Sequence, residues 1–62
     1  MTTNKEKYFL ALKNSNGQLD EIALGESIGF TNDQTIQIIE ELVNEGKIEF
    51  QSFGLCSYRV RQ

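Results

Sequence analysis

Six side chains between residues 32 and 61 have types suited to binding chemistry. Asn32, Gln34 and Gln37 carry amides, which can form paired hydrogen bonds with the edge of an adenine. The other three, Lys47, Arg59 and Arg61, carry positive charges that can neutralise phosphate groups. These groups can hold a ligand, but none of them is a nucleophile or a general base poised near neutral pH.

The rest of the sequence offers no catalytic set. There is no His, only one Cys and no Gly-rich phosphate loop. Glu40 and Glu41 are neighbours on a predicted helix and project in different directions, so they do not form a carboxylate pair. Cys56 is expected to point inward as a small core residue, because a reactive thiol needs an accessible, electropositive site. With no second soft ligand for zinc, we expect no enzyme activity, no cofactor and no metal.

Length and composition indicate one small domain. A chain of 62 residues buries only about 60% of the surface that its unfolded form exposes, so help from a partner or a second copy is expected. No apolar run approaches the ~20 residues of a membrane span, and no signal-peptide pattern is present. A single Cys fits a reducing compartment. We therefore expect residues 1–62 to be a complete cytoplasmic domain without membrane contact.

Capping residues and periodicity predict three helices followed by a hairpin. The first helix covers about 4–13, beginning after a capping box of Thr3 and Glu6 and placing Phe9 and Leu12 on one face. The second covers about 20–28, with Asp20 as its N-cap. The third covers about 32–45, with Ile38, Ile39, Leu42 and Val43 as its apolar stripe.

Alternation predicts two strands at about 47–52 and 56–61, joined around residues 52–55. Arg59 and Arg61 fall on the strand face opposite Tyr58 and Val60, so we expect both Arg side chains to reach solvent. The predicted fold class is α+β, mostly α, with a C-terminal β-hairpin.

This order of elements resembles the winged helix-turn-helix family over nearly the whole chain. The matching positions are Leu24-Gly25, Ile28-Gly29-Phe30, and Leu42 followed by Gly46-Lys47-Ile48. Gly25 permits a close crossing of two helices, and Gly29 permits the positive φ of the turn. The resemblance implies a DNA-binding module in transcription regulation. Two residues depart from the pattern. Thr35 occupies an inward position where the family has Val or Ile, and Ile36 occupies an outward position where DNA-binding members have a polar residue.

Charge opposes the DNA-binding interpretation. The stretch from Leu19 to Gly46 carries seven acidic side chains and no Lys or Arg, although phosphate neutralisation supplies most non-specific affinity for DNA. The candidate nucleic-acid contacts are Asn32, Gln34, Ile36, Gln37, Lys47, Arg59 and Arg61. About three phosphate contacts per monomer give a salt slope near −3, and a dimer doubles it. The simpler interpretation of the same cations is a solvated surface on an acidic protein, and it outweighs nucleic-acid contact.

Protein binding is the alternative, because several apolar residues lack a clear core role. Ile36 lies on the outer face of the third helix, and Phe53 and Leu55 lie at the hairpin tip. Phe53 either folds onto the core or meets a partner. In the first helix, the continuous run from Tyr8 to Leu12 leaves Tyr8 or Leu10 outside, which suggests a homodimer through this helix. The family resemblance places binding of duplex DNA ahead of an adaptor role.

Overall fold

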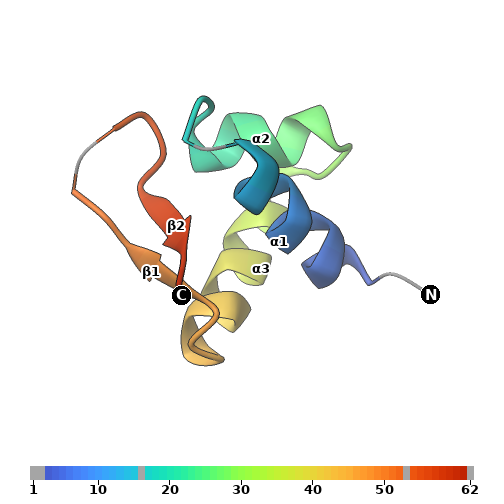
Figure 1. Ribbon diagram of the computed structural model, residues 1–62. Coiled ribbons are helices and arrows are strands. Elements are labelled where there is room, and N and C mark those ends of the chain that lie inside the picture. The colour runs from blue at the N-terminus through green and yellow to red at the C-terminus, as the bar shows by residue number, and fades with distance from the viewer. Residues whose placement is uncertain (1–2, 16, 53, 62) are drawn as a thin grey trace.

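The computed structural model describes residues 3–15, 17–52 and 54–61, and over these it has three helices followed by a two-stranded antiparallel sheet. The helices are α1 (Asn4–Ser15), α2 (Glu21–Ser27) and α3 (Asn32–Asn44), and the strands are β1 (Ile48–Phe50) and β2 (Tyr58–Val60). The helices pack together, and the hairpin lies to one side of them (Figure 1). The α+β class with a C-terminal hairpin is confirmed, and the architecture is consistent with a winged helix.

Each helix begins where the capping residues predict. The Glu6 N–H donates to Thr3 Oγ1 at 3.1 Å, and the Ala23 N–H donates to Asp20 Oδ1 at 2.7 Å. At α3 the box is reciprocal, since the Thr31 N–H also donates to Gln34 Oε1 at 2.9 Å. These bonds satisfy N–H groups that the first turn of a helix leaves without partners.

Two glycines end α2 and α3 in left-handed backbone. Gly29 has φ 89° and Gly46 has φ 74°, a region that side chains with a Cβ rarely adopt. After Gly29, the Phe30 N–H donates back to the Gly25 carbonyl at 2.9 Å. After Gly46, the Lys47 N–H donates to the Leu42 carbonyl at 3.0 Å, which turns the chain directly into β1.

The core lies where the three helices meet the base of the hairpin. Its buried members are Tyr8, Leu12, Leu24, Phe30, Thr35, Ile38, Ile39, Leu42, Ile48 and Cys56. Two expectations are corrected. In α1 the buried pair is Tyr8 and Leu12, four residues apart, while Phe9 is only partly buried. In α3 the apolar stripe stops short of Val43, which is 41% exposed.

The α2–α3 crossing is close because position 25 has no side chain. A Cβ added there would lie 2.0 Å from Thr35 Oγ1, far inside van der Waals contact. Thr35 is fully buried, as expected from its inward position, and its hydroxyl has no hydrogen-bond partner among the described residues. Gly25 therefore sets the distance between the two helices of the turn motif.

The strands are shorter than predicted. β1 and β2 pair over three residues each, with Ile48 opposite Val60 and Phe50 opposite Tyr58. Cys56 is buried, as expected, but it lies before β2 rather than in a strand. In the described parts of the chain, no helix has the length and apolar character needed to cross a membrane.

Candidate functional site

An apolar groove runs between α3 and the hairpin. Two adjoining cavities of about 390 and 500 Å³ share Ile39, Glu40, Phe50 and Tyr58 in their walls, so they form one continuous depression. We name it the α3–hairpin groove, and its apolar lining consists of Ile22, Ile36, Ile39, Val43, Phe50 and Tyr58.

Phe50 of β1 and Tyr58 of β2 form the hairpin wall of the groove. Ile48 and Phe50 are two residues apart and share one face of β1. Ile48 reaches the core and is 2% exposed, whereas Phe50 is 66% exposed. Its ring meets that of Tyr58 edge to face, with centroids 6.0 Å apart. The cross-strand pair thus presents an aromatic surface toward α3.

The opposite wall is one side of α3. Ile36, Ile39 and Val43 follow at spacings of three and four residues, which stacks them on one side of the helix. Ile39 is buried and forms the floor, while Ile36 is 48% exposed, as expected for an outer-face residue. Such a cluster of exposed apolar groups is characteristic of an interaction surface.

Among the described residues that line the groove, all charged side chains are negative. Glu21 lines it from α2 and Glu40 from the middle of α3, and no Lys or Arg joins them. An incoming ligand therefore meets apolar walls with carboxylates beside them.

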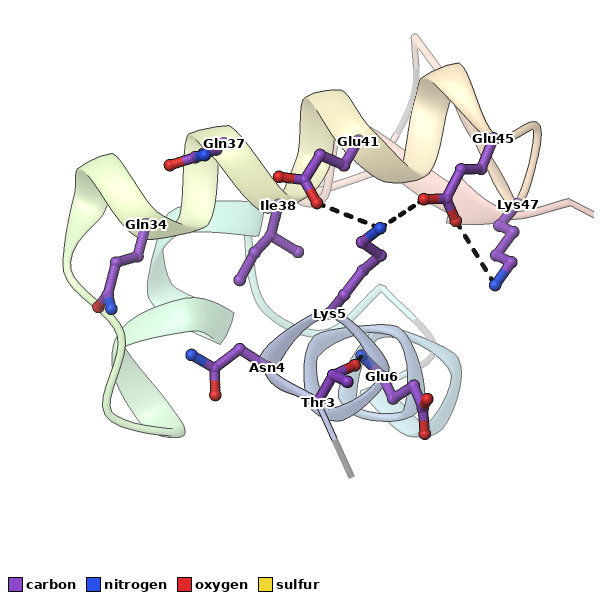
Figure 2. Close-up of a pocket in the computed structure, with 10 residues that line it drawn as sticks. All are labelled: Thr3, Asn4, Lys5, Glu6, Gln34, Gln37, Ile38, Glu41, Glu45 and Lys47. Atoms are coloured by element: carbon purple, nitrogen blue, oxygen red, sulfur yellow. Dashed lines mark hydrogen bonds and ion pairs between the residues drawn. The ribbon is translucent and has the colours of Figure 1, made fainter. Parts of the chain in front are cut away.

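A second cavity, of about 510 Å³, lies between α1 and α3 and is lined mainly by polar side chains (Figure 2). Lys5 Nζ lies 3.2 Å from a Glu41 carboxylate oxygen and hydrogen-bonds Glu45, while Lys47 Nζ lies 3.5 Å from Glu45. Hydrogen bonds to Glu45 and Glu41 raise the pKa of Lys5, and the bond from Lys5 lowers the pKa of Glu45. The cluster links the start of α1 to the end of α3.

Some of the predicted nucleic-acid contacts line these depressions. Gln34, Gln37 and Lys47 line the α1–α3 cavity, whereas Ile36 lines the α3–hairpin groove. Asn32, Ile36 and Gln37 are exposed, but the Gln34 carbonyl oxygen accepts a bond within the α3 cap.

The predicted phosphate-binding cations lie beside carboxylates. Arg59 Nη2 is 2.7 Å from Glu49 Oε2, and Arg61 Nε is 4.0 Å from Glu49 Oε1. Lys47 pairs with Glu45. Arg59 and Arg61 do reach solvent, as expected. Each exposed pair contributes little energy, yet each places a negative charge where a phosphate would have to bind.

The predicted partner surface needs one correction. Tyr8 is fully buried, and its hydroxyl donates to the Glu21 backbone carbonyl at 2.8 Å. Burial, above all, raises the pKa of this phenol. Tyr8 therefore offers nothing to a partner, and the expectation that one of Tyr8 and Leu10 stays outside is met by Leu10, at 50% exposed. Leu55 is 69% exposed, and Phe53 lies outside the described residues.

Phe50, Tyr58 and Val43 were not expected at a binding site. Helical spacing predicts Val43 on the core-facing stripe, and strand alternation puts Phe50 and Tyr58 on the apolar faces of the two strands. The signal in the sequence is the number of apolar residues, because the strands and α3 continue their apolar stripes beyond what so small a core covers.

Cys56 lacks the accessible surroundings of a reactive thiol. Cys56 is fully buried, and this burial raises the pKa of its thiol, which disfavours the thiolate. Among the described residues, no three His, Cys, Asp or Glu side chains gather in a way that could hold a metal ion. No protein-family model, no curated protein and no solved structure matches this chain.

Proposed function

We propose that this chain is a cytoplasmic winged-helix protein-binding module whose docking surface is the α3–hairpin groove. One observation carries the proposal: Ile36, Val43 and Phe50, which are 48%, 41% and 66% exposed, line the walls of a single depression. Scattered exposed apolar residues need no explanation, but a contiguous group of them favours an interaction surface. The partner is another protein.

A second copy of the chain fits this groove poorly. Docking groove to groove would bring Glu21 and Glu40 toward their equivalents, and like charges facing each other in an interface are unfavourable. Of the two residues that were candidates for a homodimer contact through α1, Leu10 is exposed and Tyr8 is buried. A single exposed Leu is normal on the surface of a monomer.

Duplex DNA is the second candidate function, and the exposed first turns of α3 favour it. Asn32, Ile36 and Gln37 are accessible there, where helix-turn-helix proteins contact base edges. We rank it below protein binding because the Glu49 carboxylate pairs with both Arg59 and Arg61 on the hairpin. A carboxylate at that position opposes the phosphate contacts on which such binding depends.

Site-specific photo-crosslinking in the cells that produce the protein tests protein binding. We expect benzoylphenylalanine in place of Phe50 to give a discrete protein adduct, and the same group in place of the exposed Asn14 on α1 to give none. The adduct should disappear in an Ile36→Glu background, and the purified adduct protein should bind the unmodified chain but not this variant. Equal adducts at positions 50 and 14 would reject the groove as the docking surface.

A titration with duplex DNA at ~50 mM salt, a condition that strengthens phosphate contacts, tests the second candidate. DNA binding predicts amide shifts at residues 32–37 and at Arg59 and Arg61 that vanish as salt is added. Such shifts would reverse the ranking of the two functions, and a spectrum unchanged by DNA would exclude the second.

A further inference from the structure

On the basis of the proposed function, we infer that the partner segment is an amphipathic α-helix whose apolar stripe is flanked by Lys or Arg. The inference comes from three properties of the α3–hairpin groove: the groups that its walls offer, its length along α3, and the sign of its charges.

The walls offer mainly side chains to a ligand. The α3 backbone is hydrogen-bonded within the helix, and β1 and β2 pair with each other along their inner edges, so an extended segment could find backbone partners only at an outer edge of this two-stranded sheet. On its side toward α3 such a segment would bury N–H and C=O groups without partners, which is costly. A helix satisfies its own backbone and presents only side chains, so it is the occupant that such walls accept.

The apolar part of the groove matches two turns of a helix. Ile36 and Val43 mark its extent along α3, and seven residues at 1.5 Å each span ~10 Å. A helix packed alongside covers this length with apolar residues at positions i, i+3 or i+4, and i+7. Phe50 and Tyr58 supply the aromatic wall against which the central residue packs.

Charge selects the flanks of the incoming helix. Glu21 and Glu40 line the groove, and its described lining residues include no cation. Lys or Arg beside the apolar stripe is attracted to these carboxylates, while Asp or Glu is repelled. The carboxylates are near the surface, so this selection weakens as salt rises.

Three synthetic helical peptides test the inference on the full-length protein by amide shift titration. The first has Leu at i, i+4 and i+7 with Lys flanks, the second has the same Leu residues with Glu flanks, and the third keeps the Lys flanks but replaces Leu with Ser. We expect the first peptide to shift Ile36, Val43, Phe50 and Tyr58. We expect the second to bind at least fivefold more weakly, and the third not to bind.

Variants separate charge selection from general attraction to an acidic protein. Glu40→Gln should weaken binding of the first peptide about two- to fivefold, the size expected of an exposed charge pair. Glu26→Gln, at an exposed α2 position that does not line the groove, should leave binding unchanged.

The outcomes distinguish this inference from the proposed function. Equal binding of the first two peptides would overturn the basic flanks and leave the groove as a docking site. Binding of the third peptide equal to the first, binding of no peptide, or concentration-dependent groove shifts in the protein alone would overturn the helical partner. The crosslinking experiment at position 50 then tests the proposed function independently of the peptides.

Discussion

Phe50 and Tyr58 face each other across the hairpin, with ring centroids 6.0 Å apart and planes at 82°. This edge-to-face geometry is the favourable one for aromatic pairs. It holds the ring of Phe50, a residue that is 66% exposed, beside the groove. The pair thus stabilises a surface that the fold itself leaves uncovered.

Replacing Phe50 with Ala should separate stability from docking. Loss of the aromatic pair should lower the free energy of unfolding by about 0.5–1.5 kcal/mol. The loss is no larger because Phe50 is already mostly exposed in the folded protein. Partner or peptide binding to the groove should be lost. Urea unfolding and peptide titration measure the two effects. Leu55→Ala, at a position that is 69% exposed and does not line the groove, is the matched control and should change neither.

Local signals in the sequence predicted the frame of the fold well. The caps at Thr3, Asp20 and Thr31 are decided by neighbouring residues, and each of these side chains accepts an N–H from the first turn of its helix. The predicted capping box is complete at Thr31, whereas at Thr3 the described contacts include only the bond from the Glu6 N–H. The small residue at position 25 correctly predicted a close crossing with the inward-facing residue at position 35.

The candidate site depends on how layers fit together, which periodicity does not specify. The apolar run from Tyr8 to Leu12 allows more than one face of α1 to be buried. Burial of Tyr8 is favoured because the Glu21 carbonyl accepts a hydrogen bond from its hydroxyl. Phe50 continues the alternation of Ile48, yet Ile48 is 2% exposed whereas Phe50 is 66% exposed across the groove from α3. Which apolar residue of a regular stripe stays exposed is therefore set by how closely the opposing element packs on it.

The contact between Gly25 and Thr35 predicts that two substitutions change the free energy of unfolding in opposite directions. Thr35→Val keeps the shape and removes a buried hydroxyl without a partner, so it should raise the free energy of unfolding by about 1 kcal/mol. Gly25→Ala places a Cβ 2.0 Å from Thr35 Oγ1 and should lower it by about 1–3 kcal/mol.

Thermal unfolding measures both variants, since 1 kcal/mol shifts the midpoint of so small a domain by about 4–8 °C. Thr31→Val is the control for Thr35→Val. It makes the same chemical change at a hydroxyl that accepts the Gln34 N–H, so it should destabilise by about 1 kcal/mol. A loss of stability in Thr35→Val would show that the buried hydroxyl is satisfied in solution.

The hydroxyl of Tyr8 should contribute measurably to the packing of α1 on α2. Tyr8→Phe removes the bond to the Glu21 carbonyl but keeps the buried ring, and the expected cost is about 1 kcal/mol. Urea unfolding measures it. Tyr58→Phe, at a half-buried position in the groove wall, should cost less. Equal stability of Tyr8→Phe and the parent would mean that the hydrogen bond adds nothing to folding.

The Lys5–Glu45 pair should make α1 docking sensitive to pH at both ends of the scale. The pKa of Glu45 is lowered from 4.5 by its bond to Lys5, so its contribution is complete above pH 4.5 and is lost as pH falls through the lowered value. The pKa of Lys5 is raised from 10.5 by Glu45 and Glu41. Its contribution is therefore complete below pH 10.5 and is lost as pH rises through the raised value.

Lys5→Gln isolates this contribution from the other titrating groups. The urea midpoint of the variant should lie below that of the parent at pH 7, and the difference should shrink as pH falls below 4.5 and again as pH rises above 10.5. It should also shrink in ~1 M salt, which screens exposed charges. Lys7→Gln is the control, since Lys7 is exposed on the same helix and has no ion pair within the described ranges. A pH-independent difference for Lys5→Gln would assign its effect to packing of the side-chain stem rather than to charge.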